Sequence, residues 1–97
     1  MIRVAWIEYA IQIIQNHPQL LKMLEDSITK KLTDPEEKVR IATVTALGTL
    51  CTAHPQILPK KLMLDLAERC KDKKGPVRTE AALVISKVFD KVYTTSL

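Results

Sequence analysis

The stretch Asp34-Pro35-Glu36-Glu37-Lys38-Val39-Arg40 decides the fold of this chain, because Asp72-Lys73-Lys74-Gly75-Pro76-Val77-Arg78 repeats its spacing. In both stretches the Asp precedes the Arg by six residues, and a Val stands directly before the Arg. The two Val-Arg pairs lie 38 residues apart, and the pair Ile2-Arg3 lies 37 residues upstream of the first. A fixed period of this length is typical of repeat proteins and predicts a structural unit that recurs along the chain.

The histidine–proline pairs follow the same period and predict where helices end. His17-Pro18-Gln19-Leu20-Leu21 is similar to His54-Pro55-Gln56-Ile57-Leu58, which lies 37 residues later. Proline cannot continue a helix that precedes it, whereas it is favoured at the first helical position. We therefore expect a helix to begin at Pro35, with Asp34 as its cap. No sheet is expected. The five predicted helices span about 2–15, 18–32, 35–53, 56–71 and 76–93, and the repeats span 2–38, 39–76 and 77–97.

Composition favours a small helical domain and excludes several classes of protein. The 97 residues are 46% hydrophobic and 27% charged, which is typical of a soluble globular chain. No apolar run approaches the ~18 residues that a membrane span needs. Two cysteines are too few for a disulfide framework, and no signal peptide is recognised, so a reducing compartment is expected. The net charge of +4 comes entirely from residues 49–97.

The Asp–Arg spacing resembles the signature of the HEAT repeat, and this resemblance implies an all-α solenoid of about two and a half helical hairpins. Its structural signature falls on Asp34, Arg40, Asp72 and Arg78. A carboxylate at the start of the second helix of a hairpin can accept backbone N–H bonds and can also bind an Arg of the adjacent unit. We expect repetition of these contacts to form a ladder along the stack.

A closer resemblance covers most of the chain. The start Arg3-Val4-Ala5-Trp6-Ile7-Glu8, the run Asn16-His17-Pro18-Gln19-Leu20 and both Asp–Arg stretches are similar to the cohesin-associated HEAT proteins of the precocious-dissociation-of-sisters family. The resemblance implies a nuclear, chromosome-associated regulator of sister chromatid cohesion. It implies a non-enzymatic interaction scaffold without a cofactor, which binds the kleisin subunit of cohesin and the wings-apart-like protein. The alternatives are a generic HEAT scaffold in transport, translation or another chromatin complex, and direct nucleic-acid binding.

The nucleic-acid alternative depends on a basic segment, residues 60–78. Its candidate contacts to phosphates or to an acidic partner are Lys60, Lys61, Lys71, Lys73 and Lys74. Clustered cations neutralise phosphates, but acidic residues are interleaved here and aromatic stacking residues are absent nearby. A solvated charged surface is the competing interpretation, and DNA contact is secondary to protein binding.

Metal and catalytic sites are not expected. Cys51 and His54 lie three residues apart, but no second ligand pair accompanies them at zinc-site spacing. Cys51 follows the apolar stripe of its helix and is expected to be buried, and the histidines are expected at one edge of the stack. No glycine-rich phosphate loop exists, since the chain has only Gly48 and Gly75. Gly48 inside a helix instead indicates close helix packing.

The first predicted helix is apolar around most of its circumference, which indicates burial on two sides. In a solenoid such a helix belongs to an interior unit that contacts a preceding repeat. We therefore expect the chain to be a fragment of a longer solenoid, or to cover this face by self-association.

Overall fold

The computed structural model describes residues 2–96, with side chains described for residues 2–88, and within this part the chain is helical and has no strand. Short 3₁₀ turns precede the second helix, at Pro18–Leu20, and follow the fourth, at Arg69–Lys71. The five α-helices are α1 (Ile2–Asn16), α2 (Leu21–Leu32), α3 (Glu37–Ala53), α4 (Lys60–Glu68) and α5 (Gly75–Ser96).

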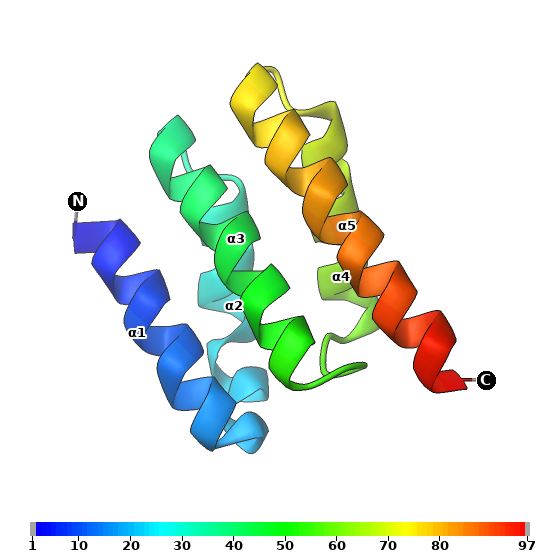
Figure 1. Cartoon of the computed structure of the whole chain (residues 1–97). Coiled ribbons are helices and arrows are strands. Elements are labelled where there is room, and N and C mark those ends of the chain that lie inside the picture. Colours follow the sequence, from blue (N-terminus) through cyan, green and yellow to red (C-terminus); the bar gives the residue numbers. More distant parts are fainter. Residues whose placement is uncertain (1, 97) are drawn as a thin grey trace.

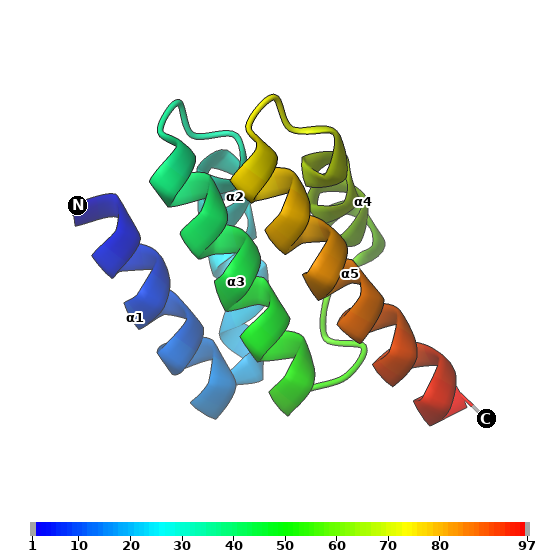
Figure 2. The ribbon, with the colours of Figure 1, turned by 45° about the horizontal axis from the view of Figure 1, so that its top comes forward.

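The helices form two layers (Figure 1). Helices α1, α3 and α5 lie side by side in one layer, and α2 and α4 form the second layer behind them; the rotated view in Figure 2 shows the same arrangement. The overall dimensions are 37 × 26 × 18 Å. This architecture of successive hairpins, α2–α3 and α4–α5 stacked on α1, confirms the predicted all-α HEAT solenoid.

The predicted start of the third helix is wrong by two residues. Asp34 does not cap the helix: its Oδ1 accepts a hydrogen bond of 2.9 Å from the backbone N–H of Glu36, which closes a turn ahead of the helix. The backbone of Glu36 is still extended, with φ −89° and ψ 128°, and α3 begins at Glu37. Pro35 therefore lies in the turn ahead of α3. The Asp34 carboxylate, which was expected to cap the helix, stabilises this turn instead.

The fourth helix also begins later than residue 56. Gln56 has a positive φ of 69°, the only such value among the described non-glycine residues, and Pro59 is extended, with ψ 155°. A residue with positive φ cannot belong to a right-handed helix, so the regular helix starts at Lys60. Residues Pro55 to Leu58 therefore form a turn that leads into α4.

Apolar side chains from both layers form one continuous core. Helix α1 supplies Ile7, Ile11 and Ile14, and α3 supplies Leu47, Leu50 and the predicted buried residue Cys51. The second layer supplies the remaining central contacts: Ile28 and Leu32 from α2, and Leu62 and Leu66 from α4. Eight of these ten side chains have no exposed surface, so the layers are held together chiefly by burial of apolar area.

Gly48 lies where α3 and α5 pack closely, as its position inside a helix predicted. A Cβ atom built on Gly48 would lie 2.9 Å from Cγ2 and 3.1 Å from Cγ1 of Val84. Val84 is β-branched and almost completely buried, so it cannot move aside by changing rotamer. The absence of a side chain at Gly48 therefore sets the distance between these two helices.

We expect Gly48→Ala to destabilise the chain by about 1 kcal/mol, because overpacking costs about 1–3 kcal/mol and the better helix propensity of Ala returns roughly 1 kcal/mol. Gly75→Ala is the matched control, since its Cβ would meet only Nη2 of Arg78 at an ordinary 3.5 Å. Urea unfolding of both variants measures the difference. Equal stability of the two variants would contradict close packing at Gly48.

Candidate functional site

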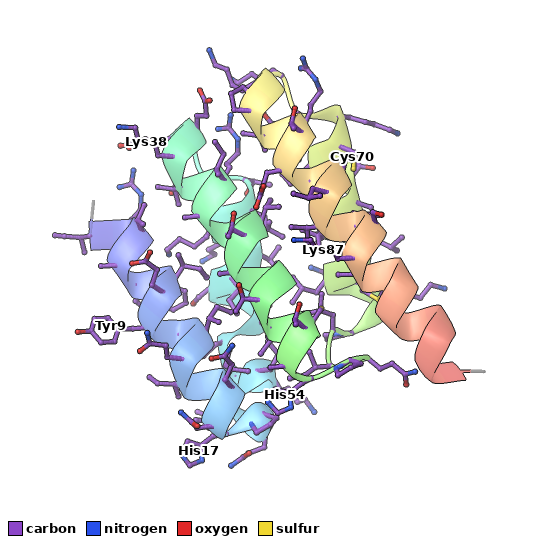
Figure 3. The ribbon with its side chains drawn as sticks, viewed as in Figure 1. Tyr9, His17, Lys38, His54, Cys70 and Lys87 are labelled. Atoms are coloured by element: carbon purple, nitrogen blue, oxygen red, sulfur yellow. The ribbon has the colours of Figure 1, made fainter. Side chains whose placement is uncertain are left out.

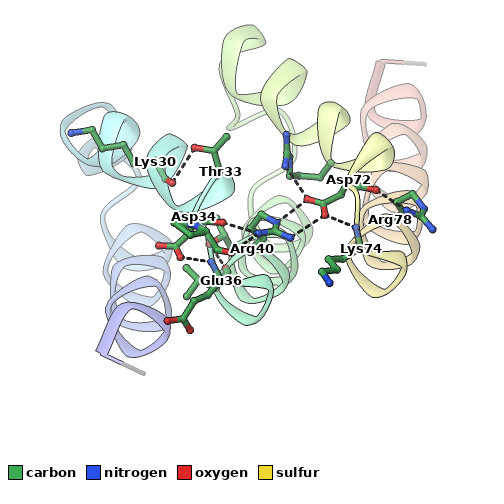
Figure 4. Close-up of polar contacts among 12 residues, drawn as sticks. Lys30, Thr33, Asp34, Glu36, Arg40, Asp72, Lys74 and Arg78 are labelled. Atoms are coloured by element: carbon green, nitrogen blue, oxygen red, sulfur yellow. Dashed lines mark hydrogen bonds and ion pairs between the residues drawn. The ribbon is translucent and has the colours of Figure 1, made fainter.

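The turns between the layers carry a ladder of arginine–carboxylate contacts (Figure 4). At the first rung, Nε of Arg3 lies 2.8 Å from Oδ2 of Asp34, and Nη2 of Arg3 donates to Oε1 of Glu36 at 2.9 Å. Arg3 was not among the residues selected from the sequence. Its position 37 residues before Arg40 is the signal that identifies it as the first arginine of the ladder.

The second rung is buried. Nε of Arg40 donates to Oδ2 of Asp72 at 2.8 Å, and Nη2 of Arg40 donates to Oδ1 at 3.1 Å. The backbone N–H of Lys74 donates to Oδ1 at 2.9 Å, and Nη1 of Arg69 donates to Oδ2 at 2.9 Å. The two bonds from Arg40 make the pair bidentate. The side chains of Arg40 and Asp72 are only 4% and 2% exposed, so the pair is also shielded from water.

Arg40 and Arg78 each also bind the turn of their own hairpin. Nη1 of Arg40 donates to the carbonyl oxygen of Asp34 at 2.8 Å, and Nη1 of Arg78 donates to that of Asp72 at 2.7 Å. The structure therefore gives the two arginines the same contact with their own turns. Arg40 adds a contact with the neighbouring hairpin, and this second contact joins the hairpins α2–α3 and α4–α5.

Arg69 is a further residue of the second rung that the sequence did not reveal. Its repeat equivalent is Lys31, whose Nζ instead lies 4.5 Å from the centre of the Trp6 ring in a cation–π contact. Because Lys31 and Arg69 make different contacts, the repeat period does not identify Arg69 as part of the ladder. Its Nε is buried and has no hydrogen-bond partner among the described residues.

The environment of Asp72 lowers the pKa of its carboxyl. Burial alone would raise that pKa, but the hydrogen bond from Arg40, the N–H of Lys74 and the charges of Arg40 and Arg69 outweigh it. The charged form is therefore favoured in the folded chain relative to the unfolded chain. Its contribution to stability is present above the unfolded pKa and is lost as the pH falls through the folded pKa.

The five candidate lysines do not form one patch. Lys60 and Lys61 lie at the start of α4 and the other three lie beyond its end, about 14 Å away at the usual rise of a nine-residue helix. Lys61 lies 3.2 Å from Asp65. Lys71 and Lys73 line a hollow of about 370 Å³ between the α2–α3 and α4–α5 turns, together with Arg69, Asp72 and Asp34.

The histidines and cysteines have structural surroundings. Figure 3 shows His17 and His54 at the same end of the layer, as predicted, and Cys70 apart from them. Nε2 of His54 lies 2.8 Å from the carbonyl oxygen of Gln15, which links the end of α3 to α1. Burial raises the pKa of the Cys51 thiol to about 11, so the reactive thiolate is disfavoured. Within the described residues, no three potential ligands lie close enough to hold a metal ion.

The outer face of α1 is apolar and exposed. Ile2, Tyr9 and Ile13 are 87%, 69% and 45% exposed. Their repeat equivalents in α3 and in α5 are all buried, at 9% exposure or less. These equivalents are Val39, Ala46 and Leu50 in α3, and Val77, Val84 and Val88 in α5. Within the described residues, no helix is long and apolar enough to cross a membrane.

The stacked hairpins and the arginine–carboxylate ladder define the class of protein, a HEAT-type helical solenoid. The model of a family described as "Sister chromatid cohesion protein PDS5 protein" matches residues 1–96, so the chain belongs to the PDS5 family. This confirms the family resemblance noted from the sequence.

The relatives are much longer than this chain. It is 28% identical over 90 residues to sister chromatid cohesion protein PDS5 homolog B of Homo sapiens and to homolog B-A of Xenopus laevis. It is 27% identical over 90 residues to PDS5 homolog A of Homo sapiens. Each match covers 93% of this chain but only 6–7% of the relative. No solved structure matches the chain.

We expect Asp72→Asn to destabilise the chain by roughly 3 kcal/mol at pH 7, because Arg40 would keep a buried charge, and Arg69 a partly buried one, without a carboxylate. The variant should also lose less stability than the parent chain on acidification below about pH 4, since it lacks the group whose lowered pKa produces that loss. Urea unfolding at several pH values measures both effects.

The control is Asp65→Asn, which removes the exposed pair with Lys61 and should change stability by only about 0.3–0.5 kcal/mol. If both variants lose the same small amount, the buried rung does not have the structural importance assigned to it.

Proposed function

We propose that this chain is a stretch of HEAT solenoid that acts as a non-enzymatic protein-interaction scaffold in sister chromatid cohesion. The observation that carries the proposal is the match of residues 1–96 to a cohesion-protein family. The fold supports it, because parallel rows of helices present an extended surface on which partner segments can lie. The site of action is the nucleus, on chromosomes.

The partner we propose first is the kleisin subunit of cohesin, and the second is the wings-apart-like protein. Immobilised chain should capture recombinant kleisin, and capture should persist as salt is raised, because an interface of packed side chains is screened less than contacts between exposed charges. The wings-apart-like protein, added as competitor, tests whether the two share a surface. Absence of kleisin capture by the folded chain would favour a generic HEAT scaffold in another complex.

Nucleic-acid binding is the second candidate, and one observation favours it: Lys71, Lys73 and Lys74 are exposed together on the α4–α5 turn beside Arg69. If this turn binds duplex DNA, affinity should fall steeply with salt and be lost when the three lysines are changed to Glu. Reversing Lys60 and Lys61 in the same way is the matched control, since they lie at the other end of α4. DNA binding that survives the triple reversal would reject this turn as the site.

We propose further that another HEAT hairpin of a longer polypeptide covers the outer face of α1, as α1 covers α3 and α3 covers α5. The burial of every repeat equivalent of Ile2, Tyr9 and Ile13 supports this assignment.

When the outer face of α1 is uncovered, its exposed apolar surface should drive self-association. In sedimentation experiments the chain should associate as its concentration rises, and Tyr9→Lys combined with Ile13→Lys should reduce the association. Met23→Lys is the control, because Met23 is 79% exposed on α2, in the other layer. A chain that stays monomeric at all concentrations would contradict the proposal that the outer face of α1 is a contact surface.

A further inference from the structure

A groove of about 580 Å³ lies between α1 and α3. Its lining comes from these two helices alone, so it opens on the layer surface rather than toward α2, which lies behind them (Figure 1). Ile11, Ala42 and Ala46 give it apolar surface, and each is buried or half-buried. Glu8 and Gln12 are exposed at its rim.

The corresponding position between α3 and α5 is closed by larger side chains. Glu80 is the repeat equivalent of Ala42, and its Oε2 accepts a hydrogen bond of 2.6 Å from Oγ1 of Thr45 across the two helices. Val84 is the repeat equivalent of Ala46, and it packs against Gly48. The groove between α1 and α3 is therefore open because alanines occupy the positions where α5 carries Glu and Val.

The polar side chains that α1 contributes to the groove have no partners among the described residues. Among residues 2–88, the Glu8 carboxylate and the side-chain amides of Gln12 and Gln15 make no hydrogen bond or ion pair. Side-chain amides both donate and accept, which matches the N–H and C=O groups of an extended polypeptide. The groove thus offers unoccupied hydrogen-bonding groups along one helix and apolar surface beneath them.

Charge selects the kind of side chain that fits. Glu8 is the one charged residue of the lining, so the groove favours a cation. A long basic side chain can lay its methylene stem on apolar surface while its charged end reaches a carboxylate. Arginine suits this geometry better than lysine, because its planar guanidinium binds a carboxylate through two parallel hydrogen bonds.

We propose that the groove between α1 and α3 binds an extended segment of a partner protein through an arginine, whose stem lies on Ile11, Ala42 and Ala46 and whose guanidinium binds Glu8. Gln12 and Gln15 bind the backbone on either side of that arginine. This inference rests on the proposed scaffold function and assigns one recognition site to it.

The test uses a defined probe, the peptide acetyl-Gly-Gly-Arg-Gly-Gly-amide, added to the ¹⁵N-labelled chain. Amide shifts should change in residues 8–15 and 42–49. A peptide with citrulline, the neutral isostere of arginine, should bind roughly tenfold more weakly, as should the arginine peptide to Glu8→Gln, because each change removes one charge of the pair.

Two further variants separate the groove from general effects. Ala46→Val introduces the residue that α5 carries at the equivalent position and should reduce binding by filling the groove, with circular dichroism reporting whether the fold is kept. Asp26→Asn removes an exposed charge from α2 and should leave binding unchanged. Equal affinity for the arginine and citrulline peptides, or shifts outside the groove, would overturn the inference.

Failure of the groove and failure of the scaffold function give different results. Kleisin capture that is unaffected by Glu8→Gln and Ala46→Val, with no peptide shifts, rejects the groove and keeps the scaffold. Localised, charge-dependent peptide shifts without kleisin capture support the groove and reject kleisin as the partner.

Discussion

The buried contact between Arg40 and Asp72 is the constraint on which the stacking of the hairpins depends. A buried ion pair contributes little net stability relative to apolar residues, because both charges lose their hydration. The pair destabilises alternative alignments of the two hairpins much more than it stabilises the observed one. Sliding or rotating one hairpin against the other would leave two buried charges without partners, so the pair selects one register among the many that apolar packing alone would allow. Arg40 can do this because it also binds the carbonyl of Asp34 in its own turn, and its guanidinium is held in place before the neighbouring hairpin meets it.

That register is transmitted through α3, which is fixed to its neighbours near both ends. Near its start, Arg40 binds the turn before α5; at its end, His54 binds the carbonyl of Gln15 in α1. Between these contacts, Gly48 lets α5 approach closely enough for Val84 to pack against the backbone of α3. Polar contacts near the ends of the helix thus set the alignment, and apolar contacts along its length supply the burial that stabilises it.

Repeat spacing predicted the hairpins and the Asp–Arg pairs because each repeat has to make the same contact with the next. Gly48 was identified from its position rather than from the repeat, since a glycine inside a helix has few explanations other than close packing. Spacing could not reveal Arg69, whose equivalent Lys31 binds an aromatic ring instead. Spacing also predicted the start of α3 too early. The Asp34 carboxylate can accept a backbone N–H bond either in a turn or at a helix start, and the path of the chain determines which of the two occurs.

The groove between α1 and α3 was equally hidden in the sequence, for a different reason. Ala42 and Ala46 are ordinary residues of a buried helix, and a small side chain leaves a hollow only if the facing helix does not fill it. In a solenoid the backbone repeats, so surfaces that differ from one unit to the next must arise from side chains at equivalent positions. The contrast between Ala42 and Glu80 is such a difference, since Glu80 reaches across to Thr45 and closes the surface where Ala42 leaves it open. The residues of the ladder therefore explain why the units stack. Positions at which equivalent side chains differ, such as Ala42 and Glu80, indicate where one unit can have a binding site that its neighbour lacks.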